Sequence, residues 1–209
     1  EVGAEISADY KSSKAPSIIK RHTGFFLFKD RASRFRFMFS SRNKASKTQI
    51  YAFKKFQAFM FKYHHYIRHI NFDGGGEFVA TEMLEYLDSQ FIEYSYTNPH
   101  TPQQNSIIER DIQTVSDKSD AQIQGMQAGD AFWHLSSTYV VGVDNSLIES
   151  KDPTFPPLEG VTGARVNLSK YLTPPLPWFC VVFVLRTDRL KSESRKARPA
   201  LFVGFPQHQ

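Results

Sequence analysis

Hydrophobic and polar residues alternate over the first forty positions as they do in β-strands. Ala4–Tyr10 reads as a short strand, Phe25–Phe28 is a short apolar segment, and Arg34–Phe39 alternates residue by residue. A period of two places the three phenylalanines of the last segment on one face of a strand and both arginines on the other. The pattern predicts a half-buried strand whose polar face, with Arg34 and Arg36, is wet and basic. DNA contact by either arginine is an added hypothesis.

The pattern changes to a helical one after this segment. Lys47–Tyr63 carries apolar residues at a spacing that predicts the buried stripe of an amphipathic helix, namely Ile50, Phe53, Phe56 and Met60. Strand-like and helix-like segments then alternate: a strand over Tyr66–Phe72, a helix over Glu82–Phe91 and a strand over Ile92–Tyr96. This alternation predicts an α/β fold.

A loop and a long helix follow. Residues 97–102 contain Pro99 and Pro102, which remove backbone donors and restrict the residues before them, so they form a loop. A helix is expected from Gln103 or Gln104 to about Gln127, with an inner side made of Ile108, Ile112, Val115 and Ile123. Asp130 is expected to cap one more helix, with Trp133 in the core.

Proline becomes frequent after this helical region. Asp152–Pro177 is expected to be an irregular connection, and Trp178–Arg186 and Leu201–Phe205 are strand candidates on either side of a basic run. We therefore predict a core over residues 1–150, a proline-rich connection over 151–177, and a small basic β-rich segment over 178–209.

Charge is distributed unevenly along the 209 residues. Residues 1–70 hold 15 Lys and Arg against 4 acids, residues 71–160 hold 3 against 15, and residues 161–209 hold 8 against 2. Basic flanks around an acidic middle suit a protein that binds a polyanion and holds cations at its centre, although an uneven solvated surface is the alternative. The single Cys180 excludes an internal disulfide, and no apolar run approaches the length of a membrane span.

Three acids stand where metal ligands are expected. Asp73 follows a predicted strand, and Glu109 lies in the long helix with 35 residues between the two. Asp9 is the one acid between Glu5 and Asp30, at the end of the first strand. Magnesium prefers oxygen ligands, and a few carboxylates can hold two ions about 3.5–4 Å apart for phosphodiester chemistry. The pattern favours a metal-dependent nuclease or polynucleotidyl transferase.

The motifs around these acids resemble the integrase catalytic core of copia-type LTR retrotransposons. The similarity rests on Asp-Gly-Gly-Gly-Glu-Phe at 73–78, Thr-Pro-Gln-Gln-Asn at 101–105, the acid spacing, Phe132-Trp133, and the basic run before Leu201–Phe205. It spans nearly the whole chain. Several separated motifs in the same order are specific, whereas a lone Asp-Gly-Gly would not be.

The resemblance implies a ribonuclease H-like fold: a mixed five-stranded sheet flanked by helices, followed by a small C-terminal β-rich appendage. It implies strand transfer, and 3′-end processing as a further step, with Asp9, Asp73 and Glu109 as catalytic residues holding two Mg²⁺ ions, for which Mn²⁺ can substitute. The residues implied to contact DNA are Gln103, Gln104, Asn105, Arg110, Arg195 and Lys196.

The resemblance also implies a biological setting. Its partners would be double-stranded DNA, from the element ends and the target, and further copies of the chain, with no membrane involved. The chain would be part of a Gag-Pol polyprotein, with a His/Cys zinc module upstream. It would act in the nucleus after a stage in a cytoplasmic virus-like particle.

Some positions depart from the family pattern. Gly74 stands where Asn is common, Asn105-Ser106 replaces Asn-Gly, and Arg110-Asp111 begins a stretch that is normally richer in positive charge. These departures keep a second hypothesis open: a catalytically silent, degenerate or domesticated integrase-derived module that binds DNA or assembles. A different ribonuclease H-like nuclease is a third and weaker alternative.

Overall fold

The structure is a computed structural model of the 209-residue chain. It describes residues 1–72, 81–96, 102–148, 154–166, 178, 180–185 and 197–202. Side chains are described within these ranges except at 102–106 and 181–199.

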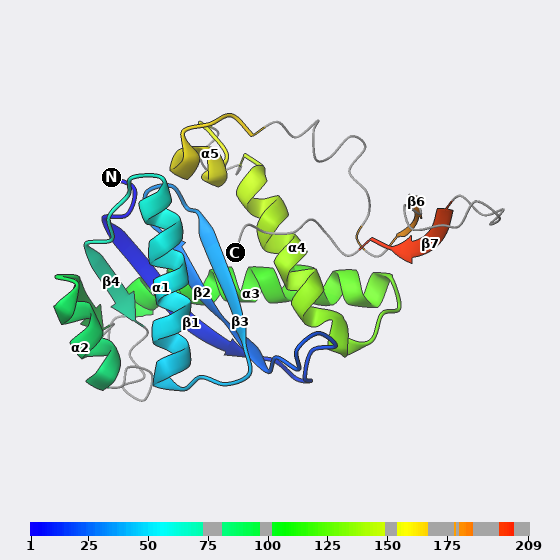
Figure 1. Ribbon diagram of the computed structural model, residues 1–209, viewed down its shortest axis with the longest axis horizontal. Coiled ribbons are helices and arrows are strands. Elements are labelled where there is room, and N and C mark those ends of the chain that lie inside the picture. The colour runs from blue at the N-terminus through cyan, green and yellow to red at the C-terminus, as the bar shows by residue number, and fades with distance from the viewer. Residues whose placement is uncertain are drawn as a thin grey trace.

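A mixed five-stranded sheet forms the centre of the fold, with strand order β3-β2-β1-β4-β5 (Figure 1). The first three strands pair antiparallel, whereas β4 and β5 continue the sheet parallel to β1. The chain runs through β1 (Glu5–Ser12), β2 (Gly24–Asp30), β3 (Arg36–Ser41), α1 (Ser46–Lys62), β4 (His69–Phe72), α2 (Thr81–Ser89), β5 (Glu93–Tyr96), α3 (Pro102–Gly125), η1 (Asp130–Phe132), α4 (Trp133–Ser146), α5 (Pro157–Thr162), β6 (Val181–Leu185) and β7 (Ala197–Leu201). The predicted order of strands and helices and the predicted sheet are confirmed.

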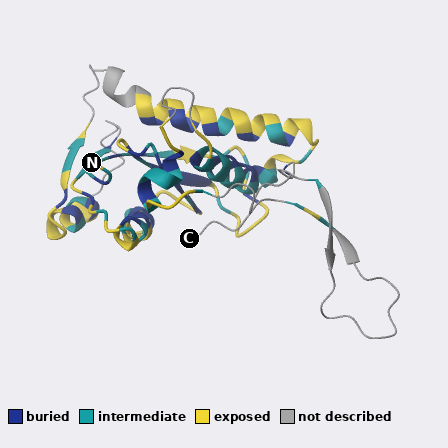
Figure 2. Cartoon of the chain, turned by 90° about the horizontal axis from the view of Figure 1, so that it is seen from above, coloured by how far each residue is buried: buried dark blue, intermediate teal, exposed yellow. Residues whose placement is uncertain are grey.

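Helices cover both faces of this sheet. Helix α1 contacts β2 and β3 on one face and packs beside α2, while α3 contacts β1 and β2 on the other face and packs against α4. Figure 2, which views the molecule from above, shows α3 on the opposite side of the sheet from α1 and α2. Its buried side faces the sheet and its exposed side faces outward.

Aromatic rings pack between α1 and the sheet. Phe28 on β2 stacks on Phe56 of α1, with ring centroids 5.3 Å apart and an interplanar angle of 9°. Phe53, Phe56 and Met60 are fully buried, and Ile50 packs against the same core. The predicted apolar stripe of α1 is therefore confirmed.

The face under α3 has a second core. All four residues predicted on the inner side of α3 are buried there: Ile108, Ile112, Val115 and Ile123. Trp133 of α4 belongs to this core, as predicted, and its indole N–H donates to the carbonyl of Ala15 over 2.8 Å. The chain segment after β1 is thereby attached to α4.

Two local predictions in the second half of the chain were wrong. Asp130 does not cap α4: it is the first residue of η1, and Phe132, which precedes α4, makes no side-chain cap hydrogen bond. The connection after residue 150 is not wholly irregular, because α5 forms within it and buries Val161 in the α1-side core. Proline at the first helical position suits this helix, since the missing N–H has no partner there in any case.

The C-terminal hairpin uses a different second strand from the one predicted. β6 pairs antiparallel with β7, with Leu185 opposite Ala197 and Val181 opposite Leu201. The second strand therefore begins within the basic run, four residues before the predicted start, and residues 203–209 lie outside the described part. The domain boundaries stay predictions. Within the described ranges, no helix is both long and apolar enough to cross a membrane.

Candidate active site

Asp9 lies on the α3 side of the sheet. In the β1–β2 register it is opposite Leu27, and Lys11 is opposite Phe25. Opposed residues of an antiparallel pair point to the same face, and both Leu27 and Phe25 belong to the core under α3 and α4. Asp9 is half-buried, and one of its carboxylate oxygens, Oδ1, accepts the backbone N–H of Tyr10 over 2.6 Å.

The β1–β4 register leads to the second predicted acid. The described parallel pairing ends with Ala8 opposite Phe72. Asp9 and Asp73 are the residues that immediately follow this pair in the sequence. Asp73 itself lies outside the described residues.

Glu109 lies on α3, which covers the face that carries Asp9. Its neighbour Ile108 is buried, while Glu109 is exposed. Successive residues of a helix are rotated by about 100°, so Glu109 occupies the flank beside the buried stripe, as predicted. Its carboxylate is accessible to a ligand, and Asp9 is on the strand that α3 contacts.

A buried group of charges fixes the opposite flank of α3. Arg36 on β3 and Lys29 on β2 are opposite each other in the sheet, and both pair with Asp111 of α3. The Arg36 Nη2 to Asp111 Oδ1 distance is 2.9 Å, and the two side chains are 7% and 9% exposed. The prediction of a wet basic face for Arg36 was wrong, because α4 packs on β3 and Asp111 of α3 pairs with the Arg36 side chain.

The same group corrects the interpretation of Asp111. Sequence alone suggested that Asp111 lowers positive charge where DNA would lie. Asp111 is two residues beyond Glu109, about 200° further around the helix, and points into the protein. Its single negative charge is shared between Lys29 and Arg36, and the two ion pairs hold α3 in register with the sheet. The signal was present, since Asp111 falls between Ile108 and Ile112 within the apolar stripe.

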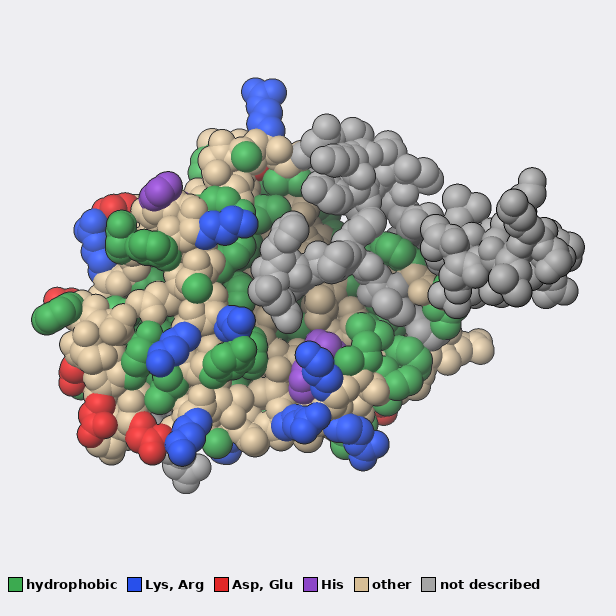
Figure 3. All heavy atoms as spheres, in the orientation of Figure 1, with side chains coloured by type: hydrophobic (Ala, Val, Ile, Leu, Met, Phe, Trp, Pro, Cys, Tyr) green, Lys and Arg blue, Asp and Glu red, His purple; other side chains and the backbone are tan. Residues whose placement is uncertain are grey.

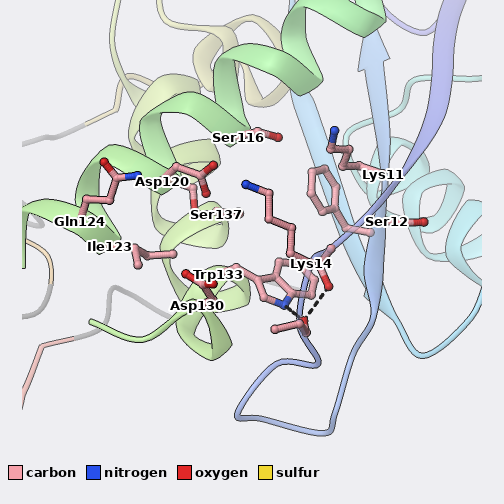
Figure 4. A pocket seen from close by; sticks show the side chains of 14 residues that line it. Lys11, Ser12, Lys14, Ser116, Asp120, Ile123, Gln124, Asp130, Trp133 and Ser137 are labelled. Atoms are coloured by element: carbon pink, nitrogen blue, oxygen red, sulfur yellow. Dashed lines mark hydrogen bonds between the residues drawn. The ribbon is translucent and has the colours of Figure 1, made fainter. Parts of the chain in front are cut away.

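A small cleft continues along the flank that carries Glu109. Ser116 and Asp120 line it, and they follow Glu109 by close to two and three whole turns. From β1 comes Lys11, two residues beyond Asp9 on the same strand face. Figure 4 shows Lys14 extending into this space between β1, α3 and α4. Its volume of about 120 Å³ holds a few waters or one small group, not a nucleotide.

The remaining predicted site residues are only partly described. Gln103, Gln104 and Asn105 lie in the first turns of α3, but their side chains are outside the described set. Arg110 is exposed on α3. Arg195 and Lys196 lie outside the described residues. Among the described residues no three His, Cys, Asp or Glu side chains gather into a metal-binding group, and the predicted triad includes Asp73, which is not among them.

The clearest pKa shifts lie away from the acids. Burial lowers the pKa of His134 to about 4, with smaller contributions from the charges of His22 and Lys20. The two imidazole rings meet edge to face, with centroids 4.9 Å apart. Burial likewise raises the pKa of Tyr139, with a contribution from Cys180. These groups belong to the α4 side of the molecule, where they shape packing.

This fold is that of retroviral integrase catalytic cores. The HTLV-2 integrase catalytic core domain, solved in complex with magnesium in a trimeric form, aligns with a TM-score of 0.57 at 15% identity, covering 75% of this chain and 95% of that one. The BIV integrase catalytic core domain aligns with a TM-score of 0.54 at 12% identity, covering 77% and 95%. The ribonuclease H-like fold is thus established.

A chain from a larger complex is also similar in fold. A chain of the simian T-cell lymphotropic virus intasome, solved with a PP2A regulatory subunit, aligns with a TM-score of 0.61 at 14% identity, over 95% of this chain and 68% of that one.

Sequence comparison points to a retrotransposon. The chain is 30% identical over 110 residues to the retrovirus-related Pol polyprotein from transposon TNT 1-94 of Nicotiana tabacum. The match covers 52% of this chain and spans only about 8% of that polyprotein. No family model matches. The resemblance predicted from the motifs is confirmed at this level: similarity to a retrotransposon Pol polyprotein, together with an integrase-core fold.

Proposed function

We propose that this chain is the catalytic core of a copia-type retrotransposon integrase, which joins element DNA to target DNA by metal-dependent strand transfer. One observation carries the proposal. Asp9 on β1 and Glu109 on α3 are presented on the same side of the sheet, and the β1–β4 register ends one residue before Asp9 and Asp73.

The donor set fits divalent magnesium. Asp9, Asp73 and Glu109 would supply carboxylate oxygens, the ligand type that Mg²⁺ prefers, and Mn²⁺ accepts the same donors. A bound pair of ions would activate the attacking 3′ hydroxyl and stabilise the leaving oxygen. The HTLV-2 cores were solved with magnesium, which supports this assignment. The Tyr10 N–H orients the Asp9 carboxylate, and the buried Asp111 group holds α3 so that Glu109 stays on the correct flank.

We infer the setting from the family resemblance, and the relatives support part of it. Duplex DNA would lie along the start of α3, near Gln103, Gln104, Asn105 and Arg110, with Arg195 and Lys196 as further contacts. The chain would act as a homo-oligomer, as the dimeric and trimeric HTLV-2 forms suggest, and as a segment of a Gag-Pol polyprotein. Its place of action would be the nucleus, after a stage in a cytoplasmic particle.

Strand transfer tests the proposal directly. A labelled oligonucleotide with the element's end sequence is incubated with plasmid DNA and Mg²⁺ or Mn²⁺, comparing the wild-type chain with Glu109→Gln. A matched control is Glu85→Gln, on the exposed side of α2. We expect joining to fall at least a hundredfold in Glu109→Gln and to be unchanged in the control. Joining that survives in Glu109→Gln, Asp73→Asn and Asp9→Asn would refute the catalytic assignment.

A silent DNA-binding or assembly module is the second candidate. Gly74 and Asn105-Ser106, which depart from the family pattern beside two of the three acids, favour it. It predicts salt-sensitive DNA binding without any joining, even when a zinc module is supplied upstream. Wild-type joining above the level of Glu109→Gln excludes it.

A further inference from the structure

The two edges of the central sheet differ in how their backbone groups are satisfied. Strand β3 forms one edge and β5 forms the other. On β3 the side-chain amide of Asn145, from α4, accepts the N–H of Arg36 over 2.9 Å and donates to the carbonyl of Arg36 over 2.7 Å. A neighbouring strand would make the same two hydrogen bonds, so the edge of β3 is already occupied at this position.

The edge of β5 has no such cover within the described residues. The N–H of Glu93 donates to the carbonyl of Arg68, the residue before β4, over 2.9 Å. Because the backbone groups of successive strand residues point to opposite sides, Glu93 and Ser95 face β4, whereas Tyr94 and Tyr96 direct their N–H and C=O groups away from the sheet. No described strand pairs with that outer side. These groups are a template for one more strand.

Aromatic side chains accompany this open edge. The rings of Tyr94 and Tyr96 lie on the same face of β5 with their centroids 6.0 Å apart, and Tyr96 is 43% exposed. Phe91, two residues before the strand, is 94% exposed, the highest value among the large hydrophobic residues that the structure describes. The edge therefore offers apolar contacts as well as backbone groups.

Phe91 also has an unusual backbone conformation. Its N–H donates to the carbonyl of Asp88 over 3.1 Å, and the N–H of Ile92 donates to the carbonyl of Leu87 over 3.0 Å. These are the two bonds of a Schellman motif, in which the residue at the place of Phe91 is usually Gly because its φ is positive. Here φ is 56°. A strained residue that presents an exposed ring suits contact with another molecule.

The surroundings of this edge are acidic. Asp88 and Glu93 flank the exposed ring in the sequence, both are exposed, and neither forms an ion pair within the described residues. No Lys or Arg occurs between Arg68 and Arg110. Lys54 of α1 reaches α2, but it lies over an aromatic ring of that helix. Figure 3 shows Asp and Glu side chains gathered at the corner of the molecule where Figure 1 places α2.

We propose that this edge binds a Lys- and Arg-rich segment of another protein in an extended conformation. The segment adds a strand beside β5 through the outward backbone groups of Tyr94 and Tyr96. Its apolar side chains rest on the rings of Phe91 and Tyr96, and its cations face Asp88 and Glu93. We name these five residues the β5 edge site. The site uses none of the three candidate catalytic acids and does not rest on the proposed catalysis.

Charge argues against two other occupants of the β5 edge site. A twofold contact with a second copy of the chain would bring two acidic surfaces together, and like charges at close range repel. Duplex DNA carries one negative charge about every 1.7 Å and is repelled by Asp88 and Glu93 in the same way. An extended basic peptide is the occupant that the open edge and the charge favour together.

Fluorescence anisotropy with a labelled ten-residue peptide of alternating Lys and Val tests the β5 edge site, in EDTA and without DNA. Alternation gives this peptide a basic face and an apolar face, and Val favours an extended backbone. Two further peptides separate the contributions. A fully N-methylated version keeps the charge and loses every backbone donor, and a version of alternating Glu and Val reverses the charge.

Two variants divide the site on the protein. Phe91→Asn removes the ring and introduces a residue that tolerates left-handed backbone. Asp88→Asn/Glu93→Gln removes the charge and keeps the size of both side chains. Circular dichroism and urea denaturation verify folding. Because Asn relieves the strain at this position, the urea midpoint of Phe91→Asn should be no lower than that of wild type, so that lost affinity is not caused by unfolding.

Matched controls change residues of the same kinds on other surfaces. Met126→Asn replaces an exposed apolar residue just after α3, and Asp117→Asn/Asp130→Asn removes two exposed acids. We expect these controls to change affinity for the Lys-Val peptide by less than about twofold. Phe91→Asn should lose at least about fivefold, and the double acid variant about tenfold at 0.1 M salt. The N-methylated peptide should bind wild type at least about tenfold more weakly.

Equal binding of the Lys-Val peptide and its N-methylated version would overturn the proposal, because it would show charge attraction without strand addition. Losses of the same size in variants and controls would overturn it too, as would tighter binding of the Glu-Val peptide. Since Glu109→Gln should bind the Lys-Val peptide as wild type does, and strand transfer is measured without any peptide, failure of this proposal and failure of the catalytic one are distinguishable.

Discussion

The helices pack on the two faces of the central sheet through different kinds of contact. Under α1 and α2 the contact is made by aromatic rings, such as Phe28 on Phe56. Under α3 and α4 the apolar core is interrupted by a buried ion group, Lys29–Asp111–Arg36. Apolar packing tolerates small shifts, whereas a buried charge group has one favourable arrangement, because a displaced charge loses its partner. The face that carries Asp9 and receives α3 is thus the one whose register is set by charge.

The largest effect is expected on the aromatic face. Phe56→Ala should lower the free energy of unfolding by about 4 kcal/mol, because it removes a fully buried ring from a stack of aromatic neighbours. Urea denaturation measures this loss. Phe61→Ala is the control on the same helix: that side chain is 60% exposed, and its loss should cost less than about 0.5 kcal/mol. Similar losses in both variants would contradict the burial assigned to Phe56.

The next largest effect is expected at the ion group. Asp111→Asn should cost about 3 kcal/mol, because Lys29 and Arg36 stay buried without a compensating negative charge. Asp117→Asn, on the exposed side of α3, is the control and should stay within about 0.5 kcal/mol. Denaturation gives both values. A neutral Asp111→Asn would mean that α3 is held by apolar packing alone.

The α4 side should also respond to pH. His134 has a folded-state pKa of about 4, below the ordinary 6.5, so the folded state binds its proton less readily than the unfolded state does. Its contribution to stability is therefore fully present above pH 6.5 and is lost as the pH falls from 6.5 to 4. The loss should reach up to about 3 kcal/mol. His134→Phe should flatten the pH dependence of Tm in this window, whereas His64→Asn, at an exposed position, should leave it unchanged.

The smallest effect is expected when the whole ion group is replaced. Lys29→Met/Arg36→Met/Asp111→Leu should remain within about 1 kcal/mol of wild type, since apolar residues of similar size often replace a buried ion group without loss. Comparison with Asp111→Asn separates the cost of an unpaired charge from the value of the group itself. A loss above about 3 kcal/mol in the triple variant would show that the charges contribute net stability.

Most of the secondary structure could be predicted from the periodicity of apolar residues along the chain. The apolar stripes of α1 and α3 were predictable because a helix buries residues at fixed spacing, and Phe53, Phe56, Ile108 and Ile112 follow it. The strand order was predictable only through the resemblance, since pairing between distant segments leaves little trace in local pattern. Asp130 was misjudged because a residue suited to capping can equally begin a 3-10 turn.

Similar limits applied to the candidate site. Asp9 and Glu109 could be selected from motif and spacing, and the structure puts β1 and α3 in contact. Arg36 was misassigned because alternation separates the two faces of a strand but does not show whether a later helix covers the second face. Here α3 and α4, more than sixty residues further along, do so.

The sequence by itself determined the strands of the central sheet and the helices α1 to α3, and it selected the candidate acids, because these follow from local spacing and from motifs. Only the tertiary structure decided that Lys29, Arg36 and Asp111 are buried together. That depends on which segments meet across the sheet, which is set by the burial of apolar surface over the whole chain.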